Sequence, residues 1–356
     1  GRHGVDELQR ILAGRTVDFG FRVGPDALDV SGGTNRDDLL LQLQLIAAYL
    51  TDPGYRPEAL RLTQKGLDQL YTGLAHSTSG PLQTEVPRLL ASGDPRFGLP
   101  ARDVTLSRTL EETKAWLAPQ LARGPVEIAL VGDLDPDAAI DAVAKTLGAL
   151  PPRQPRPALA AEREVHFPAP FAKDYAVPTE IPKGTIAVYW PTADANEIHR
   201  SRRLALLGEI LSDRLRVKVR EELGGAYSPE AHNNGSDTYP GYGYMVASAT
   251  VDPAKAAQIA ALVVSIGADL QQNGVTEDEL KRAVQPILTS LRESARTNNY
   301  WMNVLGRAQE KPETLDWSRT RYSDFEAITK PELDALARAY LGPERSFRVI
   351  VLPDKK

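Results

Sequence analysis

The stretch "ADLQQNGVTEDEL", residues 268–280, repeats an earlier stretch of the same chain, "AYLTDPGYRPEAL", residues 48–60. The two align without a gap at an offset of 220 residues (268 − 48 = 220). Four pairs of positions match in this register: Leu50 with Leu270, Gly54 with Gly274, Glu58 with Asp278, and Leu60 with Leu280. Each stretch lies between two helical patterns, with its glycine in the connection. An internal repeat at a fixed offset indicates a duplicated structural unit.

The same register holds at a pair of capping boxes and, to within one residue, at a pair of apolar strands. The capping boxes are Thr109-x-x-Glu112 and Thr329-x-x-Glu332 (329 − 109 = 220), and the strands are "VEIALV" at 126–131 and "FRVIVL" at 347–352. A capping box satisfies the first free backbone N–H groups of a helix, so each one predicts a helix that leads into a closing strand. Two copies of one α/β unit are therefore expected.

The fold class predicted from these patterns is α+β, with two repeated α/β-roll domains whose antiparallel sheets carry helices on one face. In the second copy, "TIAVYW" at 185–190 and "YGYMVASATV" at 242–251 predict strands. The expected boundaries are 1–152 for the first roll, 153–162 for a proline-rich linker, and 163–356 for the second roll. Because the second copy begins near Glu164 (164 − 220 = −56), the first roll would lack the counterpart of about its first 56 residues. Either this sequence is cut inside a domain, or a separate piece of chain supplies those strands and the helix that goes with them.

Composition narrows the class of protein. The chain has 356 residues, 42% hydrophobic and 25% charged, and a formal net charge of −5, which disfavours nucleic acid as the main partner. No apolar run reaches the roughly 18 residues of a membrane helix, so no membrane partner is expected. There is no cysteine, which excludes disulfide and thiol chemistry.

A helix predicted from Glu197 to Leu223 ends in "REELGGAYSP". Gly224 and Gly225 form the expected turn, since glycine adopts the left-handed conformation that ends many helices. Arg220 then lies in the last helical turn and Tyr227 at the start of a strand. Two interpretations are open: both side chains act on a ligand, or Arg220 complements the helix dipole and Tyr227 packs half-buried.

These residues resemble the insulysin/pitrilysin-type peptidases, the M16 family of inverted-motif zinc enzymes. The resemblance rests on the arginine and tyrosine spaced as in Arg220 and Tyr227, on "REELGGAYSP", and on "VEIALVGDLDPDAAIDAVAKTLGALPP" at 126–152, and it covers essentially the whole chain. It implies two halves that close on an unfolded peptide, with zinc in the N-terminal half and the arginine and tyrosine reaching across from the other. The bacterial long forms are the most similar, which favours the periplasm over the cytoplasm.

The zinc motif of that family, H-x-x-E-H followed by a distant glutamate, does not occur here. The five histidines are His3, His76, His166, His199 and His232, and no two are four residues apart. The helix expected at 57–71 offers only Glu58 and Asp68. We therefore expect the non-catalytic half of a zinc endopeptidase, with no cofactor of its own. Its partners would be an H-x-x-E-H-bearing half, in the same or another polypeptide, and a peptide substrate. The alternative is a non-peptidase scaffold or binding module with the same fold.

Three smaller features have plain interpretations. His76 and His232 are expected on the surface, in polar loops. Tyr300 and Trp301, in "RTNNYWMN", are expected to pack in the core. The basic residues of the 197–223 helix either line a peptide chamber or, as the simpler expectation, solvate an exposed helix face. They are Arg202, Arg203, Arg214, Arg216, Lys218 and Arg220.

Overall fold

The computed structural model describes the backbone of residues 1–223 and 226–354, and the side chains of residues 1–219 and 228–354. Contacts group the chain into two compact units. Unit 1 consists of Gly1–Lys65, Leu106–Ala158 and Ala295–Leu315, and unit 2 consists of Gly66–Thr105, Leu159–Ser294 and Asp316–Lys356. The predicted domain boundaries at 152 and 163 stay a prediction.

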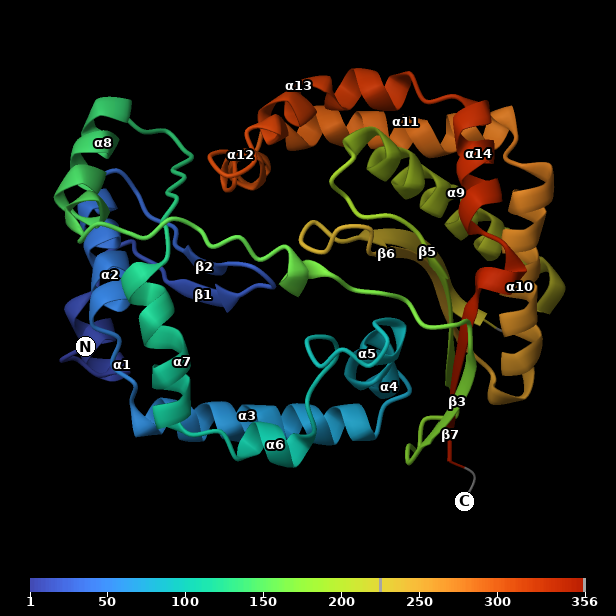
Figure 1. Cartoon of the computed structure of the whole chain (residues 1–356), viewed down its shortest axis with the longest axis horizontal. Coiled ribbons are helices and arrows are strands. Elements are labelled where there is room, and N and C mark those ends of the chain that lie inside the picture. The colour runs from blue at the N-terminus through green and yellow to red at the C-terminus, as the bar shows by residue number, and fades with distance from the viewer. Residues whose placement is uncertain (224–225, 355–356) are drawn as a thin grey trace. The chain divides into compact units, whose positions relative to one another are not determined.

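Unit 1 is mostly helical and contains one small antiparallel sheet (Figure 1). Its elements are α1 (Val5–Ile11), β1 (Gly20–Val23), β2 (Leu28–Ser31), α2 (Leu39–Thr51), α7 (Leu110–Arg123), α8 (Pro136–Lys145), the 3-10 turn Leu147–Ala149, and α12 (Asn298–Leu305). Three helices cross from one unit to the other along the chain: α3 (Pro57–Ala75), α6 (Arg102–Leu106) and α13 (Glu313–Glu326).

The proline-rich segment that follows residue 150 is held against unit 1 by two arginines. Arg153 donates to the backbone oxygen of Leu121. Arg156 pairs with Asp26 at 2.9 Å and with Glu310, and Arg307 reaches the same Asp26 oxygen at 2.8 Å. The Asp26 side chain is only 8% exposed, so a partly desolvated ion-pair network anchors this segment.

Unit 2 is built on a five-stranded sheet in the order β3-β7-β4-β6-β5. Its elements are α4 (Gly80–Thr84), α5 (Val86–Leu90), the 3-10 turns Ala161–Arg163, Pro253–Lys255 and Pro343–Arg345, β3 (Ala172–Val177), β4 (Gly184–Pro191), α9 (Ile198–Leu223), β5 (Ala226–Gly235), β6 (Gly243–Val251), α10 (Ala256–Asn273), α11 (Glu277–Ser294), α14 (Lys330–Tyr340) and β7 (Phe347–Pro353). The predicted strands at 185–190, 242–251 and 347–352 and the helix at 197–223 are confirmed. Both capping boxes form, at Thr109 and at Thr329.

The main core lies between this sheet and a layer of helices. Alternate residues of β4, Ile186, Val188 and Trp190, face that layer and are fully buried against α9, α10, α11 and α14. Burial of so many aliphatic side chains, at about 25 cal/mol per Å² of apolar surface removed from water, makes this layer the dominant stabilising contact of unit 2. The stretch Pro253–Asn273, which includes α10, is long and apolar enough to cross a membrane by length and composition alone. Its side chains Ile259, Val263, Ile266 and Leu270 are core residues here.

The α+β fold class is confirmed, with three corrections of detail. The predicted strand at 126–131 is not a strand. The sheet of unit 2 is not wholly antiparallel, because β3 pairs with β7 in parallel. Helices also cover both faces of the sheet, since α5 lies on the face opposite α10 (Figure 1). Val86 and Leu90 of α5 share a buried apolar cluster with Val349. The segment 80–90 fills apolar surface that the single-face prediction would have left open to water.

Candidate functional site

The helix α9 places the predicted site by packing closely on β5. Its stripe of Leu204, Leu207, Leu211 and Leu215 is at most 1% exposed. Gly208 lies where an added Cβ would come within 3.1 Å of the His232 backbone, a tight contact, so the absence of a side chain favours this close approach of the helix to the strand. The helix and the strand that follows it are therefore held by tight side-chain and backbone contacts.

The predicted site residues lie at the junction between these two elements. Arg220 is in the last turn of α9, as expected, and Tyr227 is the second residue of β5. Gly224 and Gly225, the predicted turn, lie outside the described residues, and so do the side chains of Arg220 and Tyr227. The structure does describe the backbone of Arg220 and Tyr227 and the pairing of β5 with β6.

A β-bulge interrupts β5 directly after Tyr227. Tyr227 is paired with Thr250, but Glu230 is paired with Ser248, so β5 carries one more residue than β6 in this interval. Ser228 has φ of 51°, the left-handed region that a residue other than glycine rarely adopts. Pro229 has no N–H to donate, which a bulge on an edge strand tolerates. Bulges with such strained residues concentrate at functional sites, where they redirect side chains.

Beyond the bulge, β5 alternates regularly between a buried and an exposed face. Ala231 is buried in the main core, whereas Glu230, His232 and Asn234 are exposed. We call these three residues the β5 polar row. Asn234 donates to the Tyr244 hydroxyl at 3.0 Å, and burial raises the pKa of Tyr244 although this hydrogen bond opposes the rise. His232 is on the surface as predicted, but in a strand and not in a loop. The period-two alternation could have revealed the row, but the bulge breaks the pattern at its start.

Three basic side chains of α9, Arg202, Arg203 and Arg214, are paired internally and do not solvate a helix face. Arg216 and Lys218 are exposed, in line with the simpler expectation. Arg202 is 5% exposed and donates to Asp324 of α13 at 2.8 Å, and Arg203 donates to the other oxygen of the same carboxylate at 2.9 Å. His199 also bonds Asp324, through Nδ1 at 2.8 Å. Burial opposes ionisation of Asp324, but these hydrogen bonds outweigh it and lower its pKa to about 2.

A second internal pair anchors the middle of α9. Arg214 makes two hydrogen bonds to Glu279 of α11, at 2.7 and 2.9 Å, and a third to Asp269 at 2.6 Å. The carboxylate of Glu279 resists ionisation through burial, yet hydrogen bonds from Arg214 and from the Thr276 backbone lower its pKa to about 2. Together, these paired arginines fix α9 to α10, α11 and α13.

The described residues do not fit a zinc site. Among the side chains that the structure describes, those of residues 1–219 and 228–354, no three His, Asp or Glu groups converge on one point. On α3, Glu58 pairs with Arg61 and Asp68 with Arg102, so neither carboxylate is directed at a shared ligand. A hydrolytic zinc needs three protein ligands and an open position, and the described part of this chain offers no such set.

Tyr300 and Trp301 are also not core residues. Their rings contact each other edge to face at 5.2 Å, but Trp301 is 41% exposed and its indole N–H donates to the Ala295 backbone. The expectation of core packing is therefore wrong: α12 has no buried residue. The N-cap of α12 is Thr297, whose side chain accepts from the Tyr300 backbone N–H.

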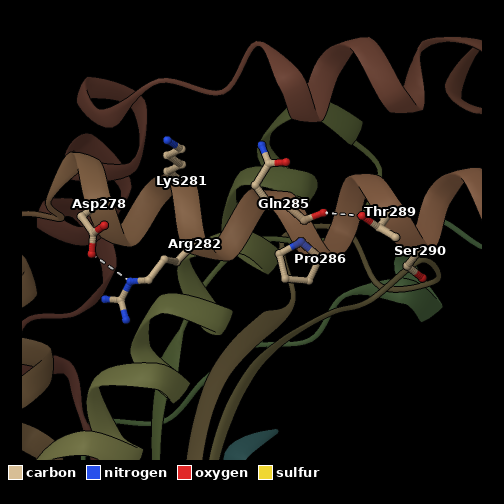
Figure 2. Close-up of a pocket in the computed structure, with 7 residues that line it drawn as sticks. All are labelled: Asp278, Lys281, Arg282, Gln285, Pro286, Thr289 and Ser290. Atoms are coloured by element: carbon tan, nitrogen blue, oxygen red, sulfur yellow. Dashed lines mark hydrogen bonds and ion pairs between the residues drawn. The ribbon is translucent and has the colours of Figure 1, made fainter.

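Two surface depressions lie away from β5 and show no catalytic grouping. One, of about 790 Å³, follows a single helix face (Figure 2) and is lined by Asp278, Lys281, Arg282, Gln285, Pro286, Thr289 and Ser290 of α11. The other, of about 520 Å³, lies between α9 and α11 and is lined partly by the same residues. Figure 2 shows Arg282 directed at Asp278, and these two groups form an ion pair of 2.9 Å.

Comparisons with known proteins agree on one family. A family model described as the peptidase M16 inactive domain matches residues 109–287, half of the 356-residue chain. The chloroplast stromal processing peptidase of Pisum sativum is 31% identical over 106 residues, which are 30% of this chain and 8% of that protein. The chain thus spans less than a tenth of the curated relatives it matches.

Solved structures share the fold. The peptidase M16 inactive domain from Pseudomonas fluorescens superposes with a TM-score of 0.81 at 18% identity, over 99% of this chain and 85% of that one. The periplasmic protease PqqL from Escherichia coli does so with a TM-score of 0.79 at 18% identity, over 99% of this chain and 39% of that one. The matched family model spans both α9 and β5, the elements of the predicted site. The chain belongs to the peptidase M16 inactive domain family.

Proposed function

We propose that this chain is the non-catalytic half of a zinc metalloendopeptidase and forms one wall of a chamber that encloses a peptide. The family match carries the proposal, because the inactive domain it names includes the helix and strand that hold Arg220 and Tyr227. The absence of a convergent donor set in the described residues supports placing zinc in a partner half rather than here. That partner half would bear H-x-x-E-H, in the same or another polypeptide.

In this proposal Arg220 and Tyr227 stabilise the transition state of amide hydrolysis. Attack on the peptide carbonyl builds negative charge on its oxygen. A guanidinium or a phenol that donates to that oxygen stabilises the transition state more than the ground state, which raises kcat. The edge position of β5 supports this role, because an extended peptide can lie along an edge strand.

The test is reconstitution with the zinc-bearing half. Cleavage of an extended fluorogenic peptide is followed for the wild-type chain and for Tyr227→Phe and Arg220→Ala. Loss of transition-state stabilisation lowers kcat by about tenfold or more with little change in KM. A fall in substrate affinity alone would assign the residues to binding. Unchanged kinetics in both variants, with circular dichroism showing the native fold, would reject the catalytic role and leave the scaffold alternative.

Periplasmic residence belongs to the same proposal. It is supported by the periplasmic protease PqqL, which has the same fold over 99% of this chain. Fractionation of cells that express the full-length protein tests it: recovery with the cytoplasmic markers would contradict it.

A further inference from the structure

The bulge in β5 changes which residues share a face of the sheet. In a regular strand, residues an odd number apart point to opposite faces, so positions 227 and 230 would be separated. Here the extra residue at the bulge brings positions 227 and 230 back to the same face of the sheet. Positions 227 and 230 are paired with Thr250 and Ser248, two residues apart on β6, and therefore lie on the same face. The β5 polar row thus continues the line of positions that begins at 227.

This line is accessible along the edge of the sheet. The strand β5 is the last in the order β3-β7-β4-β6-β5, so among the described residues one side of its backbone has no neighbouring strand. The apolar cluster on the same face of the sheet is built on Val246, Tyr189 and Val349, with Val86 and Leu90 of α5. Glu230, His232 and Asn234 remain exposed. A peptide strand beside β5 would have alternate side chains next to this row.

Among the row, Glu230 carries the available charge. Its carboxylate accepts one long hydrogen bond, 3.4 Å from the Ser248 hydroxyl. Within the part of the chain whose side chains are described, no lysine or arginine forms a salt bridge with it. Asn234, in contrast, is engaged by Tyr244. An exposed carboxylate next to a strand-binding edge attracts a cationic side chain.

We propose that Glu230 is a specificity-determining residue that favours a lysine or arginine in the bound peptide. The proposal rests on the proposed function, since it takes the peptide to lie along β5 with its reacting carbonyl near Tyr227. Two strand positions span about 7 Å. The preferred basic residue therefore lies about two residues from the cleaved bond, on the side set by the direction of the peptide.

The experiment uses the reconstituted complex of both halves and a set of extended fluorogenic peptides. Lysine, glutamine or glutamate is placed in turn at each of the three positions on either side of the cleaved bond, and kcat/KM is measured. The wild-type complex should prefer lysine over glutamate at one position. Glu230→Gln should reduce that ratio about threefold and Glu230→Lys should invert it, as expected for an exposed charge pair. The preference should also weaken as salt is raised.

The matched control is Asp174→Asn, an exposed acid on β3 at the opposite edge of the same sheet. It should leave the ratio unchanged. If the ratio of kcat/KM for lysine over glutamate is the same in wild type and Glu230→Gln at every position, the specificity role of Glu230 is overturned. The proposed function is judged separately, because a lowered kcat in Tyr227→Phe would still support it. If Glu230→Lys does not fold, Glu230→Gln carries the test alone, because it keeps the size of the side chain.

Discussion

Replacing Asp324 by asparagine should destabilise the protein far more than other acid-to-amide changes on the same helix. The carboxylate binds Arg202, Arg203 and His199 and is 7% exposed. Its pKa falls from 3.8 to about 2, and at 1.36 kcal/mol per unit the ionised form contributes roughly 2 kcal/mol to folding. Asparagine also leaves the buried Arg202 guanidinium without its counter-ion, which by itself costs about 3–5 kcal/mol in comparable buried pairs. The second figure already includes the loss of the ion pair, so the two are not summed and we expect a loss of about 3–5 kcal/mol.

The assay is urea unfolding followed by circular dichroism at pH 7, with Asp316→Asn as the control on α13. Asp316 is 75% exposed and pairs with an exposed Arg319, so its change should stay within about 0.5 kcal/mol. The folded-state pKa of Asp324 is depressed, so its contribution is complete above about pH 4 and is lost as the pH falls through about 2. The gap between wild type and Asp324→Asn should narrow over that interval. A loss below about 1 kcal/mol, or one equal to that of the control, would refute the assigned role of the network.

Three further outcomes follow from the structure. Gly267→Ala should destabilise the protein by about 1–3 kcal/mol, because the new Cβ would lie 2.8 Å from the fully buried Trp190 ring. Gly66→Ala, where the new Cβ would have nothing within 4 Å, should stabilise its helix by up to about 1 kcal/mol. Thermal unfolding of both variants tests this, and stabilisation by Gly267→Ala would contradict the packing. Ser228→Gly should keep or raise stability and Ser228→Val should lower it by about 1–2 kcal/mol, since φ is 51° there; equal denaturation midpoints would argue against the bulge. The purified chain should bind no stoichiometric zinc, which metal analysis by mass spectrometry after dialysis checks; one equivalent would overturn the placement of zinc in a partner half.

Local signals predicted much of the fold. Both capping boxes formed where Thr-x-x-Glu precedes an apolar stripe, and β4, β6 and β7 matched short runs rich in β-branched and aromatic residues. These signals are local because the partner atoms are a few residues away, or because the periodicity itself reports which face is buried.

The errors have a common physical cause. The run "VEIALV" at 126–131 has the composition of a strand, but a strand also needs the backbone of a neighbour, and residues 125–131 are assigned to no strand. The packing of Val86 on Val349 joins residues more than 260 positions apart (349 − 86 = 263), which no periodicity encodes. Within the predicted site, the spacing of Arg220 and Tyr227 was readable from the sequence. The bulge was not, since it depends on how β5 and β6 align.

The segment 80–90, which covers the second face of the large sheet, has a consequence for biosynthesis. Val86 and Leu90 leave the ribosome long before β7, which begins at Phe347 and supplies much of the surface they bury. Until β7 emerges, Val86 and Leu90 cannot pack on it and stay exposed to water and to other nascent chains. Translation of this segment should therefore rely on chaperone capture of residues 80–90, and slowing elongation before residue 347 would lengthen the period during which they are exposed.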